Sequence, residues 1–502
     1  MNIWLLPLSL FVLGGAANAM AQISTAASDP LVGQASAQPP VGPGDPQTPQ
    51  ASEPEAPGES PFVKTRDPRL WRVKAWAVLR PDFGVQLVQI DGEPVERRLY
   101  VENGLLANST TLNGIDWFEC DGDGMQGGPG FLYHEGVLAW PIVVTSSNAQ
   151  LGADPAGEPA IDATVEIADI TIPYQAEFIA SDDGYAELVL DLEPTINERG
   201  DVRNAFLQRG VDDLNLLRLN VTWDLVSYNV SFDESRARRV SWPEGDWPAE
   251  AAYALEPDLG ITYDAEGLYD EEMVRTFLEG ATSGKDPKSV APVVLAKWLA
   301  ASLFETVQAN GTGMRRSVGA GAALNALSSF KTRSPGQTLL EGRGSKMDLA
   351  TTLVAVYRAA GLPARLLVVY DEGEADPSRA GRPFEDGRSN ASAVRFLVEF
   401  ALYDEESNTL GWVPVDIDQL DTRYSRIPPG FMDNPQEFFG NLSDGRFLVP
   451  LSFYLHPAGT PLPGLAEPAL WSWFFDTNAA GLGRACHGVW WSVSSAPVTG
   501  DQ

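Results

Sequence analysis

The sequence predicts an α+β protein in which an antiparallel β-sandwich is followed by a mixed α+β domain. Apolar and polar residues alternate between about residues 66 and 250, which is the period of half-buried strands. From about Tyr269 the apolar residues instead recur every three to four positions, as they do on one face of a helix. Because the chain has 502 residues and is 44% hydrophobic, it can bury more than one core, so we expect two domains.

The composition is strongly acidic. The 68 Asp and Glu residues outnumber the 35 Lys and Arg residues and give a formal net charge of −33. A surface of this sign repels nucleic-acid phosphates and anionic lipid, so the sequence argues against nucleic-acid partners. The usual meaning of such a surplus is the solubility of a secreted surface.

The N-terminus has the pattern of an export signal. An apolar run at residues 3–13 is followed by the small-residue motifs Ala17-Asn18-Ala19 and Ala19-Met20-Ala21, so we expect residues 1–21 to be a signal peptide cleaved after Ala21. The apolar run is too short to span a bilayer, and no membrane span is predicted elsewhere. The predicted location is periplasmic or secreted.

Residues 22–65 are rich in Pro, Ala, Ser and Gly, and they hold too few large apolar groups to offset the entropy lost on ordering. We expect a disordered linker there. The strands of the predicted sandwich follow in residues 66–250, and two of its alternating runs, Leu217–Trp223 and Val226–Phe232, flank a short connection. That pair predicts a hairpin.

A glycine- and acid-rich loop, Asp116–Gly130, interrupts the strands. Its carboxylates could bind calcium, but their spacing is not that of an EF-hand, so a solvated loop is the alternative and we assign neither metal nor cofactor. The two cysteines of the chain, Cys120 and Cys486, either form a disulfide in an oxidising compartment or remain separate buried thiols.

The most informative stretch predicts a helix with a defined start and end. Ser345 precedes Asp348 by three residues, which is the spacing of a capping box at a helix N-terminus. Gly361 suits the left-handed position that ends a helix, and Pro363 prevents its continuation.

Amphipathic patterns predict two further helices, at residues 270–278 and 287–307, before the capped helix. Alternating patterns predict three strands after it, at residues 366–370, 394–400 and 411–416. The last two strands are expected to form an antiparallel pair beside the capped helix.

This order of capped helix, strand, strand and aspartate resembles the core of the transglutaminase-like superfamily, which shares the papain-like architecture. The resemblance covers about residues 256–419 and is strongest in the glycine-rich turn with Asp348 and Ala350 and in the segment Ala360–Arg365. It implies a transglutaminase-like α+β domain at residues 251–419.

In that superfamily a catalytic cysteine starts the helix, a histidine opens the next strand and a carboxylate orients the histidine. The resemblance maps these positions onto Lys346, Arg395 and Asp416. An arginine is not a general base because its pKa stays above about 12, and a charged lysine at a helix N-terminus is not nucleophilic. We therefore expect no catalytic residue and a pseudoenzyme.

An active enzyme with a non-standard nucleophile remains the alternative. Ser345 is the nearby hydroxyl, but it would need a base, and the three histidines of the chain, His134, His456 and His487, lie outside the motif positions. Ser345 is more simply explained as the residue that caps the helix.

The predicted binding site consists of the relic positions and their neighbours: Lys346, Arg395, Glu399, Trp412 and Asp416. Its two cations either form a positive pocket for an acidic group of a protein or peptide partner, or they pair with Asp416 and fill the old site. The expected function is binding or scaffolding of an extracytoplasmic protein or peptide. A carbohydrate-binding protein centred on the β-sandwich is a further alternative.

The C-terminal segment, residues 420–502, combines Pro-rich turns with a high density of aromatic residues. Aromatic clusters are more often core than binding surface. We expect this extension to pack on the second domain.

Overall fold

The computed structural model describes residues 60–82, 85–90, 93–102, 105–109, 111–112, 115–116, 135–153, 157, 159–167, 170–181, 184–192, 217–256, 271–316, 327–372, 393–457, 468–476 and 484–495. The predicted signal peptide, nearly all of the predicted linker, Cys120 and residues 117–130 of the acidic loop lie outside the described residues.

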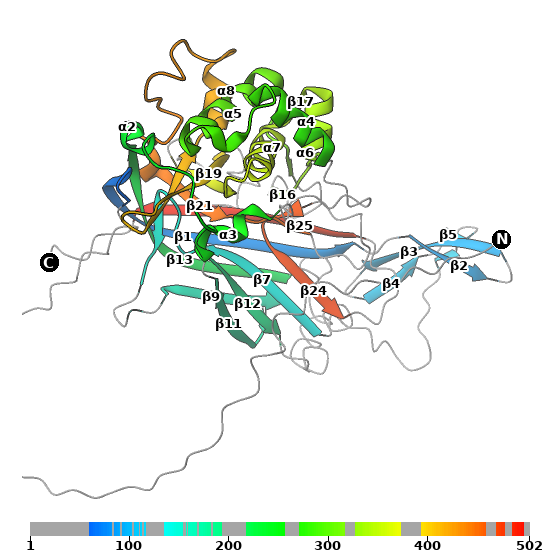
Figure 1. Cartoon of the computed structure of the whole chain (residues 1–502). Coiled ribbons are helices and arrows are strands. Elements are labelled where there is room, and N and C mark those ends of the chain that lie inside the picture. Colours follow the sequence, from blue (N-terminus) through cyan, green and yellow to red (C-terminus); the bar gives the residue numbers. More distant parts are fainter. Residues whose placement is uncertain are drawn as a thin grey trace, which may run out of the picture. The chain divides into compact units, whose positions relative to one another are not determined.

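The largest unit is an eight-stranded sheet in the order β10-β9-β13-β1-β25-β16-β15, with β8 paired to β13 (Figure 1). Its strands are β1 (Val63–Asp82), β8 (Ala149–Leu151), β9 (Ile161–Ile167), β10 (Ile170–Thr171), β13 (Leu217–Phe232), β15 (Met314–Arg316), β16 (Leu327–Phe330) and β25 (Arg484–Ser495). The long strand β1 pairs antiparallel with β13 on one side and with β25 on the other. One sheet therefore combines strands from the beginning and from the end of the described chain.

A four-stranded antiparallel sheet has the order β11-β12-β7-β24. Its strands are β7 (Glu135–Val143), β11 (Tyr174–Ala180), β12 (Tyr185–Leu192) and β24 (Ser472–Asp476). The two sheets share a core in which the rings of Trp140 and Trp223 lie 6.4 Å apart. Smaller pairings join β2 (Val85–Ile90), β3 (Glu93–Glu102) and β4 (Leu105–Ser109), then β5 (Thr111–Leu112) and β6 (Ile115–Asp116), and β22 (His456–Pro457) and β23 (Pro468–Ala469).

The predicted hairpin at residues 217–232 is instead one continuous strand, β13. All of it pairs with β1, from Leu217 opposite Leu79 to Phe232 opposite Val63. The buried positions change phase near Leu225, because the first half of β13 faces the four-stranded sheet and Phe232, near its end, packs against Phe439 instead. In the sequence the two halves of β13 therefore look like separate alternating runs.

The second sheet system has the order β20-β19-β18-β21 and is covered by helices. Its strands are β18 (Ala364–Asp371), β19 (Val394–Asp404), β20 (Thr409–Val415) and β21 (Leu448–Ser452). The main helices are α4 (Glu271–Thr282), α5 (Pro292–Thr306), α6 (Pro335–Glu341), α7 (Lys346–Ala359) and α8 (Ile417–Arg423). The described residues also form shorter elements: α2 (Glu234–Ala237), α3 (Ala249–Ala252), the paired strands β14 (Gln308–Ala309) and β17 (Arg343–Gly344), and the 3-10 turns Tyr253–Leu255, Pro287–Ser289 and Gly445–Phe447.

Helix α7 lies at the centre of this part and forms as predicted. The Ser345 hydroxyl accepts a hydrogen bond from the Asp348 N–H, and the Asp348 carboxylate accepts one from the Ser345 N–H. Gly361 has a φ of +81° directly after the helix. Tyr357 then fixes α7 to its neighbours, because its ring packs 5.7 Å from that of Phe400 on β19 and its hydroxyl donates to the Ala296 carbonyl of α5.

The ends of the described chain differ from the expected domain limits. The predicted linker extends to residue 65, yet Phe62 is completely buried and β1 begins at Val63. The C-terminal extension divides between two sheets: β21 pairs with β18, whereas β24 pairs with β7 and β25 with β1. Apolar residues explain both differences, since Phe62 and the tryptophans of the tail are buried in cores assembled from distant segments.

Candidate functional site

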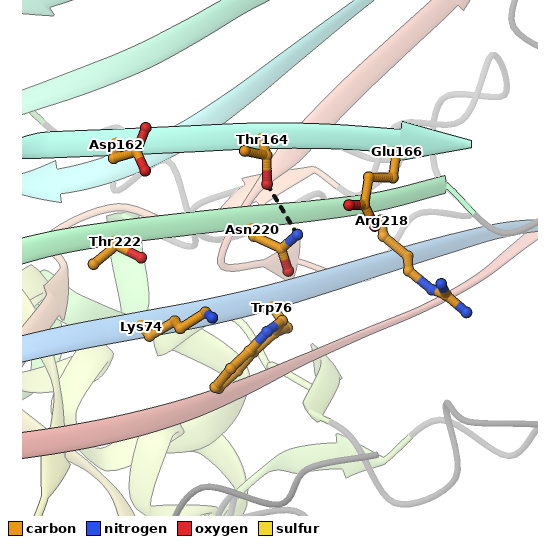
Figure 2. A pocket seen from close by; sticks show the side chains of 8 residues that line it. All are labelled: Lys74, Trp76, Asp162, Thr164, Glu166, Arg218, Asn220 and Thr222. Atoms are coloured by element: carbon orange, nitrogen blue, oxygen red, sulfur yellow. Dashed lines mark hydrogen bonds between the residues drawn. The ribbon is translucent and has the colours of Figure 1, made fainter. Parts of the chain in front are cut away.

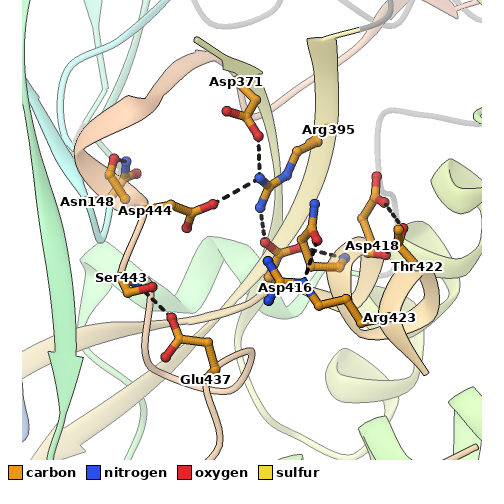
Figure 3. A network of polar contacts seen from close by, with 12 residues as sticks. Asn148, Asp371, Arg395, Asp416, Asp418, Thr422, Arg423, Glu437, Ser443 and Asp444 are labelled. Carbon is orange, nitrogen blue, oxygen red and sulfur yellow. Dashed lines mark hydrogen bonds and ion pairs between the residues drawn. The ribbon is translucent and has the colours of Figure 1, made fainter. Parts of the chain in front are cut away.

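Arg395 lies on β19 and is only 4% exposed. Its guanidinium forms ion pairs with Asp371 and Asp416 and a longer one, 3.1 Å, with Asp444 (Figure 3). Asp371 ends β18, Asp416 caps α8, and Asp444 comes from the segment before β21. A single buried cation therefore holds together a strand end, a helix start and a loop.

The electrostatics of this cluster follow from its excess of acid. Burial lowers the pKa of Arg395, but the neighbouring carboxylates of Asp416, Asp371 and Asp444 outweigh burial and raise this pKa above its ordinary value, so the arginine is charged. Burial raises the pKa of Asp416 to about 6; Arg395 opposes this increase, and Asp418 adds to it.

Lys346 is the first residue of α7 and pairs with a different carboxylate. Its Nζ forms an ion pair with Asp418 and donates to the Thr422 hydroxyl at 2.6 Å. Both partners belong to α8, so this contact joins the N-terminus of α7 to α8. Lys346 and Arg395 therefore lie at the same end of the domain, linked through residues of α8.

Glu399 and Trp412 belong to another network, centred on the buried Arg365. The Arg365 Nε donates to the completely buried Glu399 carboxylate at 2.7 Å, and its guanidinium lies 4.0 Å from the centre of the Trp412 ring. The guanidinium also lies 3.8 Å from the centre of the Phe453 ring. Glu399 also accepts from the Ser147 N–H at 2.8 Å, so it connects β19 to the segment after β7. Glu399 and Trp412 are therefore both partners of Arg365 on the neighbouring strand β18.

The contacts of Ser345 and His487 belong to a helix cap and to a buried aromatic cluster, respectively. The Ser345 hydroxyl accepts from the Asp348 N–H at 3.1 Å, within the capping box. His487 is buried on β25 with its ring 4.7 Å from that of Trp473, and burial lowers its pKa to about 4. The side chains of His134 and His456 lie outside the described residues.

Sequence reasoning named Asp416 as a partner of the two cations but missed the other acidic partners, Asp371, Asp418 and Asp444. Asp418 follows Asp416 by two residues in a helix start, which is a detectable signal for a further acid at this site. Asp371 and Asp444 have no local pattern that relates them to Arg395. Within the part of the chain that the structure describes, no group of three or more His, Cys, Asp or Glu side chains is arranged to hold a metal ion.

Comparison with known families agrees with this architecture. Residues 312–417 match the model of the transglutaminase-like superfamily, which spans α7, β18 and β19 and reaches the start of α8. The chain therefore contains a domain of the transglutaminase-like superfamily, as the sequence motifs predicted.

The solved structures that match this chain are distant from it. A candidate cysteine protease from Cytophaga hutchinsonii shares 10% identity at a TM-score of 0.41, with 88% of this chain and 94% of that chain covered. The periplasmic domain of TgpA from Pseudomonas aeruginosa shares 16% identity at a TM-score of 0.19, with 58% of this chain and 100% of that chain covered. The comparison with curated proteins gives no match. None of the described helices combines the length and hydropathy needed to cross a bilayer.

Proposed function

We propose that this chain is an exported protein whose transglutaminase-like domain is catalytically inactive and acts in binding or scaffolding of an extracytoplasmic protein or peptide. In this proposal Lys346 and Arg395 occupy the positions of the superfamily's cysteine and histidine, and Asp416 retains the third position. The two larger antiparallel sheets are taken to form a β-sandwich that carries this domain. Export is supported by the signal-like residues 1–21.

One observation carries the proposal: the residue in the base position is a buried arginine bound to three carboxylates. A general base must accept a proton, and a guanidinium has no lone pair available for this. Asp416, which would orient an imidazole in an active site, is instead an ion-pair partner of Arg395 and the cap of α8.

The residue in the nucleophile position is equally unsuited to attack. Hydrogen bonds to Asp418 and Thr422 direct the Lys346 amine towards α8. The adjacent Ser345 hydroxyl is part of the capping box, and an alcohol needs a neighbouring base to become a nucleophile.

The same contacts argue against the predicted pocket for an acidic ligand. Carboxylates of the protein already pair with both Lys346 and Arg395, so a ligand carboxylate would have to displace them. We therefore propose that the cluster fills the relic site and maintains the fold, and that the partner is recognised elsewhere on the molecule.

The direct test measures catalysis by the purified full chain. A fluorescent amine donor with casein tests amide transfer, and labelled casein alone tests hydrolysis. We expect both rates to equal those of the Lys346→Ala and Arg395→Ala variants. Turnover that disappears in Lys346→Ala or Ser345→Ala would overturn the proposal in favour of an unusual nucleophile.

A second test examines the positional assignment itself. In the Lys346→Cys/Arg395→His double variant we expect the introduced thiol to react with iodoacetamide at pH 7 about tenfold faster than the thiol of Lys285→Cys, because a helix N-terminus and an imidazole both favour the thiolate. Lys285 is an exposed matched site, and the wild-type chain corrects for Cys120 and Cys486. Equal reactivity of the two introduced thiols, in a folded double variant, would mean that these are not the catalytic positions.

A further inference from the structure

A groove of about 560 Å³ lies on the eight-stranded sheet, far in sequence from the relic triad (Figure 2). Its volume is within the range of ordinary small-ligand sites, about 300–1,000 Å³. Three strands supply the whole lining: Lys74 and Trp76 from β1, Asp162, Thr164 and Glu166 from β9, and Arg218, Asn220 and Thr222 from β13.

The strand register explains why these side chains share one face. Positions two apart on a strand point the same way, and the alternate positions, such as Ala75, Val165 and Leu219, are completely buried in the core. The antiparallel pairings align the lining residues in rows across the sheet. The rows are Asp162, Thr222 and Lys74; Thr164, Asn220 and Trp76; and Glu166 with Arg218.

The charges of the lining balance. Two acidic side chains, Asp162 and Glu166, accompany two basic ones, Lys74 and Arg218, so the groove offers many donors and acceptors without net charge. The chain as a whole carries −33, which disfavours polyanions here as elsewhere. This surface suits a ligand that is polar, uncharged and rich in hydrogen-bonding groups.

The middle row adds a flat apolar surface to these polar groups. Trp76 is half-buried, with the Lys74 amine 5.0 Å from its ring centre, and the Asn220 side-chain amide donates to the Thr164 hydroxyl at 3.0 Å. An indole presents an apolar face with a polar edge. A sugar ring has a complementary structure, with a face of C–H groups and hydroxyls at its edge.

We propose that this groove binds an uncharged glycan, with a sugar ring stacked on Trp76 and hydroxyls bonded to the Thr, Asn and charged side chains of the three rows. The site is separate from Lys346 and Arg395, so the proposal stands or falls independently of the inactivity of the transglutaminase-like domain.

The test uses the full chain and isothermal titration with four neutral probes: cellohexaose, xylohexaose, chitohexaose and maltohexaose. We expect at least one of them to bind with a Kd of millimolar or tighter. Trp76→Ala should weaken this binding about tenfold or more, as truncating a central aromatic anchor does, and Asn220→Ala should weaken it less. Tyr424→Ala removes an exposed aromatic ring outside the groove and should leave the Kd unchanged.

Ionic strength distinguishes a neutral ligand from a charged one. Between 50 and 500 mM NaCl we expect the Kd to change less than about twofold, because screening acts on charged ligands. Heparin hexasaccharide serves as the acidic comparator. Absence of binding for all four neutral probes, equal Kd values for wild type and a folded Trp76→Ala variant, or tighter and salt-dependent binding of heparin would each overturn the proposal.

Discussion

Arg395 pairs with carboxylates from three separate segments. Because Arg395 is buried, its charge has to be compensated by these carboxylates. A buried charge costs several kcal/mol unless it is paired, and breaking a buried pair by removing one partner costs about 3–5 kcal/mol. Arg395 is 4% exposed, and Asp371 and Asp416 are buried beside it. This end of the domain can therefore fold only if the charges of Arg395, Asp371 and Asp416 compensate one another.

We predict that Arg395→Met lowers the free energy of unfolding by about 3–5 kcal/mol, because it leaves Asp371 and Asp416 buried without a cation. Urea denaturation of the full chain measures this change. The matched control is Arg72→Met, which breaks the pair with Asp224 at a side chain that is 60% exposed and should cost no more than about 1 kcal/mol. Similar losses for the two variants would contradict the importance of burial.

Asp416 gives a second prediction, which concerns pH. Its pKa is raised to about 6 in the folded chain, from an ordinary value of 3.8, mainly because it is buried. The folded state therefore holds this proton more tightly than the unfolded state. Through this group, stability is gained as the pH falls from about 6 towards 4, and that gain is lost as the pH rises through about 6.

The measurement compares urea denaturation of wild type and Asp416→Asn between pH 4.5 and 7.5. Asparagine also caps helices well, so the start of α8 should persist. We expect wild type to gain roughly 1–3 kcal/mol relative to the variant on acidification. A difference that is constant across this range, or that grows with rising pH, would contradict the assignment.

At the scale of single residues, the sequence motif was enough to select Lys346, Arg395 and Asp416 as candidate site residues. Each has a position that a local pattern predicts: the start of a helix, a place on a strand, and the end of the following strand. The motif did not reveal Asp371 or Asp444, since their proximity to Arg395 arises only when β18 and the segment before β21 meet β19. The motif also did not reveal Arg365, the partner of Glu399 and Trp412, because it lies on the neighbouring strand β18.

Among the elements, the start of α7 is closely packed against the chain that precedes it. A Cβ at Gly344 would lie 2.7 Å from the Asp348 Cβ, and Asp348 is already fixed by its bonds to the Ser345 and Arg333 N–H groups. Position 344 therefore requires glycine, because the backbone there passes too close to the Asp348 side chain to leave room for a Cβ.

We predict that Gly344→Ala destabilises the chain by about 1–3 kcal/mol, the usual cost of forcing extra volume into a packed site. The control is Gly280→Ala in the exposed part of α4, where no atom lies within 4 Å of the new Cβ. That substitution should stabilise the helix by up to about 1 kcal/mol. Thermal denaturation should therefore shift in opposite directions, and a shared direction would argue against this account of α7.

Strand β13 illustrates where patterns mislead. Its apolar residues change phase near Leu225, and a phase change resembles a turn when only one buried face is assumed. The connecting residues Asp224 and Leu225 include no Gly, Pro or Asn, and Asp224 is the one residue of the pair that favours a turn, so the local signal for a hairpin is weak. A strand that packs on different neighbours along its length needs no turn.

Across the whole molecule, the C-terminal strands complete sheets that begin elsewhere. Strand β25 pairs with β1 along Trp71 to Asp82, and Trp491 on β25 is 2% exposed. Strand β24 pairs with β7, and β21 with β18. Three of the sheets therefore each include a strand from beyond residue 447.

We predict that a fragment of residues 60–256 does not fold by itself, because β1 and β7 lose β25 and β24 and expose the apolar core that they cover. Near-UV circular dichroism and limited proteolysis should reveal a fragment without fixed tertiary structure, while residues 60–502 unfold cooperatively. Addition of a peptide spanning 468–502 is expected to restore some protection. Cooperative unfolding of the short fragment alone would contradict this view of the sheets.

The sequence by itself determined the limits of α7 and the strands β18, β19 and β20, because capping, periodicity and turn residues are local properties of the chain. Its motifs also resemble those of the transglutaminase-like superfamily, and the family match over residues 312–417 confirms that resemblance. Only the tertiary structure decided which carboxylate pairs with which cation, that β13 is continuous, and where the C-terminal strands lie. These features depend on segments far apart in the sequence, and what brings them together is the burial of apolar surface, which is non-directional and leaves no local pattern.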